Sequence, residues 1–239
     1  GVLQAGEAGW TLATLGYIAA ALALLAAFVW IESRVAAPLA PLGLFRSRSL
    51  VAANVIGVLW AGAMFAWFFI SALYMQLVLG FRPMEVGLAY LPGNLIMGAF
   101  SLGLSAKMVG RFGIRLPLTL GLAFASLGLA LFARAPVDGN VWADVLPAMI
   151  LLGLGGGMAF NPVLLAAMGD VRPEESGLAS GVVNTSFMMG GALGLALLAT
   201  LSASVTSNAL AAGAEQRAAL NAGYHAAFLA GAACAALAS

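Results

Sequence analysis

The sequence predicts an all-α integral membrane protein. Of its 239 residues, 63% are hydrophobic and only 8% are charged, whereas a soluble domain carries about 25% charged residues. The mean hydropathy is +1.03, and the apolar runs are long and do not alternate with polar residues. Because backbone polar groups in lipid must be satisfied within a helix or a closed barrel, runs of this kind indicate helices in a lipid bilayer.

Seven apolar segments are long enough to cross a membrane, which takes about 20 helical residues. We expect them near residues 11–31, 51–76, 86–105, 116–133, 145–167, 177–202 and 223–239. Trp10 and Trp30 bracket the first span and suit the two interfacial belts. A turn signal at Asp138 and Gly139 separates the fourth span from the fifth. A longer polar stretch, 203–221, is expected to separate the last two spans.

Positively charged residues are divided unevenly between the two sides of these spans. The loops after the first, third and fifth spans hold Arg34, Arg46, Arg48, Lys107, Arg111, Arg115 and Arg172, and the other loops hold Arg82, Arg134 and Arg217. Since Lys and Arg concentrate in cytoplasmic loops, the first set is expected inside and the N-terminus outside. We therefore expect a multi-pass protein of the cell membrane, of the bacterial inner-membrane kind.

A short sequence motif occurs twice in the chain. Residues 82–89 read RPMEVGLA and residues 172–179 read RPEESGLA, an offset of 172 − 82 = 90 that also pairs Asn94 with Asn184. Similar capping residues at two helix starts would by themselves explain why this motif recurs. Three spans separate the copies, so they point in opposite directions and indicate an inverted repeat. We predict a linker span and loop at 1–49 and a six-helix domain at 50–239, made of repeats at about 50–133 and 144–239.

Inverted repeats place a substrate site near the membrane midplane, where the two repeats meet. No Asp, Glu, Lys or Arg lies deep in any span, so the candidates are amides, hydroxyls, aromatic rings and thioethers. Each of them alone is explained as well by helix packing or lipid contact, but the set favours a cavity for a small amphipathic substrate. The predicted cavity residues are Asn54, Trp60, Met64, Trp67, Ser71, Tyr90, Asn94, Asn161 and Asn184.

Glycines are abundant in the fifth and sixth spans. Small residues four apart let helix backbones approach closely, and helices that move against each other would use the same surfaces. Pro162 is expected to bend its helix because it cannot donate to the preceding turn. The residues predicted for packing or gating are Gly153, Gly157, Pro162, Gly177, Gly181, Gly190 and Gly194. The span at 116–133, poor in polar residues, suits an outer helix, and Asp144 is expected to cap the start of the fifth span.

The order of these features resembles the C-terminal half of a major facilitator superfamily transporter, of the fourteen-span drug:proton antiporter type (EmrB/QacA-like). The residues that carry the resemblance are PLGLFRSR at 41–48, LYMQLVLG at 73–80, GLAYLP at 87–92 and GLASGVVNT at 177–185. The cytoplasmic loop motif of that family maps onto Arg111, Gly113 and Arg115, with Gly110 where the family has an acid.

The resemblance implies a 3+3 inverted-repeat half of a transporter that exports amphipathic drugs by alternating access in exchange for protons. Its implied partners are the N-terminal half of the same protein, which would supply the proton-carrying acids, the substrate and protons. Because the chain begins at Gly1 and stops at Ser239 inside an apolar run, we interpret it as a piece of a longer protein. The single cysteine, Cys234, excludes a disulfide framework within the chain and a cysteine metal cluster. We predict no metal, no cofactor and no nucleic acid partner.

Other functions are less well supported by the sequence. An exporter of one specific metabolite and a non-functional truncated fragment stay open. An intramembrane protease would use Ser180 and His225, but the predicted spans place them about 30 Å apart, and a catalytic dyad needs about 3 Å. A retinal receptor needs a lysine in its last span, and Lys107 lies in a loop. We therefore predict no enzyme.

Overall fold

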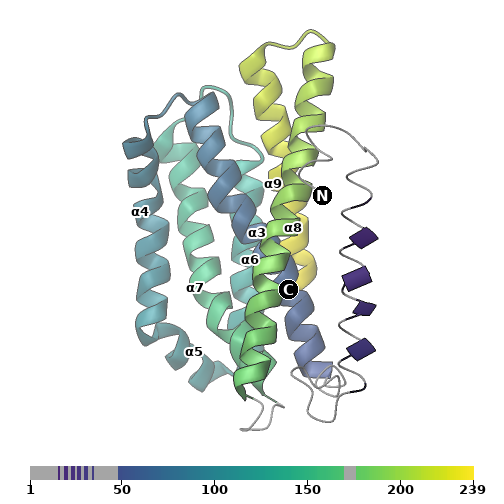
Figure 1. Cartoon of the computed structure of the whole chain (residues 1–239). Coiled ribbons are helices and arrows are strands. Elements are labelled where there is room, and N and C mark those ends of the chain that lie inside the picture. Colours follow the sequence, from purple (N-terminus) through teal and green to yellow (C-terminus); the bar gives the residue numbers. More distant parts are fainter. Residues whose placement is uncertain are drawn as a thin grey trace.

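The computed structural model describes residues 48–169 and 176–239, with isolated positions between residues 16 and 34. Trp10, most of the first predicted span and the segment 172–175 therefore lie outside the described residues. The described chain forms α3 (Arg48–Leu73), α4 (Pro83–Ala99), α5 (Ser105–Phe112), α6 (Arg115–Phe132), α7 (Leu146–Met168), α8 (Ser176–Ala211) and α9 (Gln216–Ala238), as Figure 1 shows. Single π-helical turns, η2 (Tyr74–Val78), η3 (Phe100–Leu104) and η4 (Val141–Val145), extend α3 and α4 and precede α7.

Six of the described helical segments are long and apolar enough to cross a membrane. They are Leu50–Val78, Pro83–Phe112, Arg115–Phe132, Val141–Met168, Ser176–Ala211 and Gln216–Ala238. These correspond to the second to seventh predicted spans. The predicted class, an all-α membrane protein with a six-helix domain, is confirmed.

The predicted polar loop at 203–221 is mostly helix, so this expectation was wrong. α8 continues to Ala211 and α9 begins at Gln216, and both project beyond the other helices in Figure 1. The small polar residues stay compatible with a helix because hydroxyls bond back to the preceding turn, as Ser204 does to the carbonyl of Leu201. The chain turns at Gly213, whose φ of +87° favours glycine.

The start of the fifth predicted span is capped by Asn140, and not by Asp144 as expected. The Asn140 side chain accepts a hydrogen bond from the backbone nitrogen of Trp142 at 2.8 Å. Asp144 instead accepts from the backbone nitrogen of Asn140 at 2.7 Å. The two side chains thus satisfy backbone donors at this helix start reciprocally, in the manner of a capping box.

The helices pack in pairs that an inverted repeat would produce. α3 packs along α8 and α9, and α7 packs along α4 and α6. If α3 corresponds to α7, α4 to α8 and α6 to α9, these are two sets of equivalent contacts. Glycines meet at two of the crossings: a methyl group on Gly194 would lie 2.5 Å from Cα of Gly62, and one on Gly153 would lie 2.5 Å from the carbonyl oxygen of Gly93. The packing supports the repeat boundaries, which stay a prediction.

The hydrophobic core lies around α3 and α7. Trp60, Trp67 and Tyr74 of α3 and η2 are fully buried, and Phe132 stacks on Phe228 at 5.1 Å between α6 and α9. Of the most apolar part of each span, 56% is buried in α3 and 61% in α7, but only 22% in α4 and in α8. α4 and α8 therefore present apolar faces that no described helix covers. α6, predicted as an outer helix, packs on α7 and α9 and exposes leucines on its other side.

Hydrogen bonds join η2, the loop after α6 and α9 at one end of the bundle. They involve the backbone carbonyls of Val78, at the end of η2, and of Ala135 and Pro136, in the loop after α6, which we call the carbonyl cluster. The Tyr74 hydroxyl donates to Pro136 at 2.8 Å, and Arg217 Nε donates to Val78 at 3.0 Å. Ala135 has two partners from α9. Asn221 Nδ2 donates to it at 3.1 Å and His225 Nε2 lies 2.7 Å from it.

The predicted cytoplasmic loop motif lies on and beside a short helix, α5, and not in an open loop. Gly103 in η3 has a φ of +119° and directs α5 away from the axis of α4, as Figure 1 shows. Gly113, with a φ of +75°, separates α5 from α6. Arg111 and Arg115 are exposed, and the Arg111 guanidinium lies 5.4 Å from the ring centre of Phe112. The motif glycine is therefore explained by its backbone conformation.

Candidate substrate pocket

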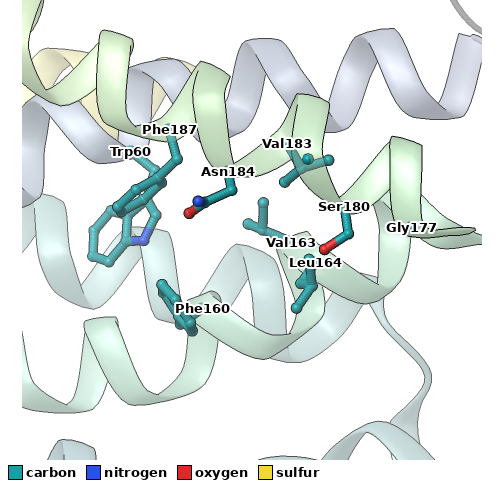
Figure 2. Close-up of a pocket in the computed structure, with 10 residues that line it drawn as sticks. Trp60, Phe160, Val163, Leu164, Gly177, Ser180, Val183, Asn184 and Phe187 are labelled. Carbon is teal, nitrogen blue, oxygen red and sulfur yellow. The ribbon is translucent and has the colours of Figure 1, made fainter. Parts of the chain in front are cut away.

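A pocket of about 440 Å³ lies between α3, α7 and α8 (Figure 2). Its size is within the range of small-molecule sites, about 300–1,000 Å³. Three helices supply its walls, and α3 lies far in sequence from the other two. The lining residues are Trp60 of α3, Phe160, Val163 and Leu164 of α7, and Gly177, Ser180, Gly181, Val183, Asn184 and Phe187 of α8.

The opening results from small and polar residues on one face of α8. Gly177 and Gly181 are four residues apart, and nothing lies within 4 Å of where a methyl group on either would be. Ser180 and Asn184 repeat the same spacing on the adjoining stripe of the helix. Figure 2 shows the Asn184 amide and the Ser180 hydroxyl on the side that faces α7. Small residues therefore provide the space, and neutral polar groups border it.

Aromatic rings form the other end of the pocket. Phe160 of α7 and Phe187 of α8 meet edge to face, with ring centres 5.9 Å apart and planes at 90°. Trp60 is only 1% exposed, and its indole nitrogen is buried with no hydrogen-bond partner among the described residues. None of the ten lining residues is ionisable. The pocket therefore suits a molecule with apolar or aromatic surface and a few uncharged polar atoms.

Two of the nine predicted cavity residues, Trp60 and Asn184, line this pocket. Three others form a hydrogen-bonded network between α3 and α4. The Tyr90 hydroxyl donates to the carbonyl of Phe68 at 2.7 Å and lies 2.7 Å from the Ser71 hydroxyl, which bonds to the carbonyl of Trp67. Trp67 Nε1 donates to Sδ of Met149 on α7 at 3.2 Å. These side chains hold helices together within the described chain.

The remaining four predicted cavity residues are dispersed. Met64 lies in the hydrophobic core. Asn54 donates to the carbonyl of Leu50 at 2.8 Å, one turn earlier in α3. Asn94 is exposed on α4 and Asn161 is half-buried on α7, and neither is among the ten residues of the pocket. Their role in binding stays a prediction.

Sequence reasoning missed most of the apolar lining. Phe187 lies three residues after Asn184, and thus on its helix face, so the spacing could have identified it. Phe160, Val163 and Leu164 surround Pro162 on α7 and carry no signal of their own, because apolar residues are everywhere in this chain.

The residues predicted for packing or gating divide into two groups. Methyl groups on Gly157 and Gly190 would lie 2.8 Å from Cβ of Phe100 and 2.6 Å from Cα of Val58, so these glycines, like Gly153 and Gly194, lie at helix contacts. Gly177 and Gly181 instead border the pocket. Pro162 is buried inside α7, which continues through it as one helix to Met168.

Comparison with known proteins relates the chain to transporters. A model of the Major Facilitator Superfamily matches residues 2–195. The chain is 35% identical over 211 residues to a cephamycin export protein of Amycolatopsis lactamdurans, covering 87% of this chain and 43% of that protein. It is 34% identical over 213 residues to a puromycin resistance protein of Streptomyces alboniger, covering 86% and 41%. A tetracenomycin C resistance and export protein of Streptomyces glaucescens is 35% identical over 211 residues, covering 85% and 38%. The chain thus spans about two fifths of the length of these relatives.

Proposed function

Because this chain belongs to the Major Facilitator Superfamily, we propose that in the whole protein it forms one wall of a cavity through which amphipathic drugs are exported. The observation that carries the proposal is the pocket between α3, α7 and α8, with its aromatic and small polar lining. Apolar walls with a few placed polar groups are typical of sites for small organic molecules.

Membership of this superfamily confirms the family predicted from the motifs and a multi-pass location in the cell membrane. It also indicates a transporter and not an enzyme. Export of drugs is supported by the relatives, three of which are named for export of, or resistance to, an antibiotic.

Alternating access requires two halves that move against each other, and the exposed faces of α4 and α8 are where we propose that the rest of the protein packs. Both faces carry large apolar side chains, among them Leu88 and Leu95 on α4 and Met188 and Leu197 on α8. Exposed glycines on the same helices, such as Gly87 and Gly98, leave room for a close neighbour.

Proton coupling is assigned in this proposal to the rest of the protein. Among the described residues, the acids within the spans lie near their ends: Glu85 pairs with Arg82 at 3.2 Å, and Asp144 bonds to the start of its own helix. Neither lines the pocket. In this proposal, a carboxyl group that binds a proton near the midplane comes from the rest of the protein.

Export of a single metabolite is the second candidate, because two relatives are named as exporters of one compound each. The breadth of the substrate range separates it from multidrug export. A pocket that binds by apolar contact accepts many shapes, whereas a dedicated exporter would accept one compound and its near analogues.

The test expresses the full-length protein in an efflux-deficient bacterium and measures resistance to, and efflux of, a panel that includes puromycin, lincomycin and a cephamycin. Asn184→Ala is expected to change the pattern of resistance, because it removes a polar group from the pocket. Asn208→Ala is the matched control, since Asn208 is exposed on the same helix beyond the pocket.

Export of several unrelated compounds supports the proposal, and export of one compound favours the dedicated exporter. No export of any compound would refute both and favour a non-functional protein. The 239-residue chain alone, reconstituted in vesicles, is expected to show no substrate-dependent proton flux, because the cavity needs its second wall.

A further inference from the structure

We propose that the indole N–H of Trp60 is a hydrogen-bond donor to the substrate, and that the part of the substrate held in this pocket is flat, apolar and uncharged with a carbonyl-type oxygen. The inference rests on the proposed function, because it assumes that the pocket binds the exported molecule. It adds the chemical class of the group that the pocket recognises.

The indole N–H of Trp60 is a buried donor without an acceptor in the part of the chain that the structure describes. Trp60 and Trp67 lie two turns apart on α3 and both are buried. The N–H of Trp67 bonds to Met149, while that of Trp60 has no partner among the described residues. Roughly 90% or more of buried polar groups in proteins are hydrogen-bonded. In an apolar setting the unpaired N–H therefore favours any acceptor that can reach it.

An acceptor can reach the Trp60 N–H from the pocket. The benzo edge of the Trp60 ring faces α7 at Gly156, where Met97 also packs, so that side is filled. Trp60 also belongs to the core cluster of buried apolar residues. Figure 2 shows the indole nitrogen directed to the side where Asn184 and Phe160 lie. The lining holds one side-chain carbonyl, that of Asn184, and it does not bond to the indole.

The lining of the pocket carries no charge. The ten lining residues include no Asp, Glu, Lys, Arg or His, so an ionised group seated here would be buried without a counter-charge, which is strongly unfavourable. A neutral oxygen can accept from Trp60 without that cost. The edge-to-face pair of Phe160 and Phe187 offers ring surfaces to a flat apolar frame. A charged part of a substrate would lie outside this pocket.

The test uses two probes that differ only at the acceptor, 9-fluorenone and fluorene, which share one tricyclic frame with either a carbonyl or a methylene group. Their binding to the full-length protein in nanodiscs is measured by equilibrium dialysis. Wild-type protein is expected to bind fluorenone about 3- to 10-fold more tightly, as one neutral hydrogen bond allows. Trp60→Phe keeps an aromatic ring but removes the N–H, and is expected to abolish this preference.

Trp142→Phe is the matched control, because Trp142 is exposed, in η4, and not part of the pocket. This variant is expected to keep the preference for fluorenone. Equal loss of affinity for both probes in Trp60→Phe would mean that only the ring matters and would overturn the inference. An unchanged preference would overturn it as well.

A measurement on unmodified protein covers the case in which Trp60→Phe fails to fold. The infrared carbonyl frequency of bound fluorenone is expected below its value in hexane, and to stay there in Asn184→Ala, which removes the amide N–H groups that also border the pocket. A frequency equal to that in hexane would overturn the inference. If the protein exports the drug panel but binds the two probes equally, this inference is wrong and the proposed function stands. If it exports nothing, the proposed function fails first.

Discussion

The two glycine pairs of α8 have the same spacing and opposite surroundings. Methyl groups on Gly190 and Gly194 would lie 2.6 Å and 2.5 Å from Cα atoms of α3, whereas those on Gly177 and Gly181 would meet nothing within 4 Å. The difference comes from the facing helix. α3 presents Gly62 to the first pair, and the second pair faces the pocket. Glycines four residues apart therefore define a smooth helix face, and the opposing sequence decides whether it is a contact or a wall of a cavity.

The largest expected effect is at the helix contact. Gly194→Leu would place a side chain against the backbone of α3, which cannot move aside as a flexible side chain can. We expect a loss of at least about 3 kcal/mol of stability and little monodisperse protein in fluorescence-detected size-exclusion chromatography of the full-length protein. Gly62→Ala is the milder control, because its added methyl would lie 3.4 Å from Gly194. Normal yield of Gly194→Leu would contradict the close crossing.

The crossing of α4 with α7 tests whether the rule extends beyond α8. In Gly153→Ala, the added methyl would lie 2.5 Å from the carbonyl oxygen of Gly93 and 2.7 Å from its Cα. We expect a destabilisation of about 1–3 kcal/mol, measured as a lower melting temperature in detergent. Gly98→Ala on α4 adds a methyl group in open space and should melt like the unmodified protein. Equal melting temperatures for both variants would mean that the α4–α7 crossing is looser than described.

The open pair should affect transport and not folding. In Gly181→Leu, nothing lies within 4 Å of the added Cβ, and the rest of the side chain extends from a residue that lines the open pocket. We therefore expect stability to change by no more than about 0.5 kcal/mol, with a correspondingly small change in melting temperature. The same side chain takes up part of the 440 Å³ pocket, and we expect a clear loss of drug efflux in cells. If Gly181→Leu lost stability but kept efflux, Gly181 would lie at a helix contact, like Gly190 and Gly194, and would not border a pocket used in transport.

The smallest effect is expected at the start of α8. Gly177→Ala adds one methyl group in open space and replaces the residue that loses most conformational freedom in a helix. The gain is at most about 0.5–1 kcal/mol, so the melting temperature should rise slightly or stay unchanged, with efflux retained. A lower melting temperature would indicate that Gly177 already touches a part of the protein that the structure does not describe.

The sequence was sufficient to predict the membrane helices, because long apolar runs that do not alternate with polar residues form helices in lipid. It was not sufficient for the pocket. Trp60 and Trp67 are both tryptophans, lie on the same helix and are equally buried. Nevertheless Trp60 lines the pocket, whereas the Trp67 side chain bonds to Met149. That difference depends on which helix lies opposite, which one sequence does not reveal. Residues 203–211 were misjudged because small polar residues suit both a loop and a helix that bonds to its own carbonyls.

The carbonyl cluster makes the two ends of this bundle mechanically unequal. Side chains from η2 and α9 donate to the three carbonyls of this cluster, at the end of the bundle opposite the first turns of α8, where the pocket begins. Each hydrogen bond joins elements that are distant in sequence. Separating these elements would break the bonds and leave their donors and acceptors unpaired, which is unfavourable. Side-chain hydrogen bonds therefore fasten the described helices to one another at that end, whereas the end where the pocket begins is bordered by glycines that leave open space.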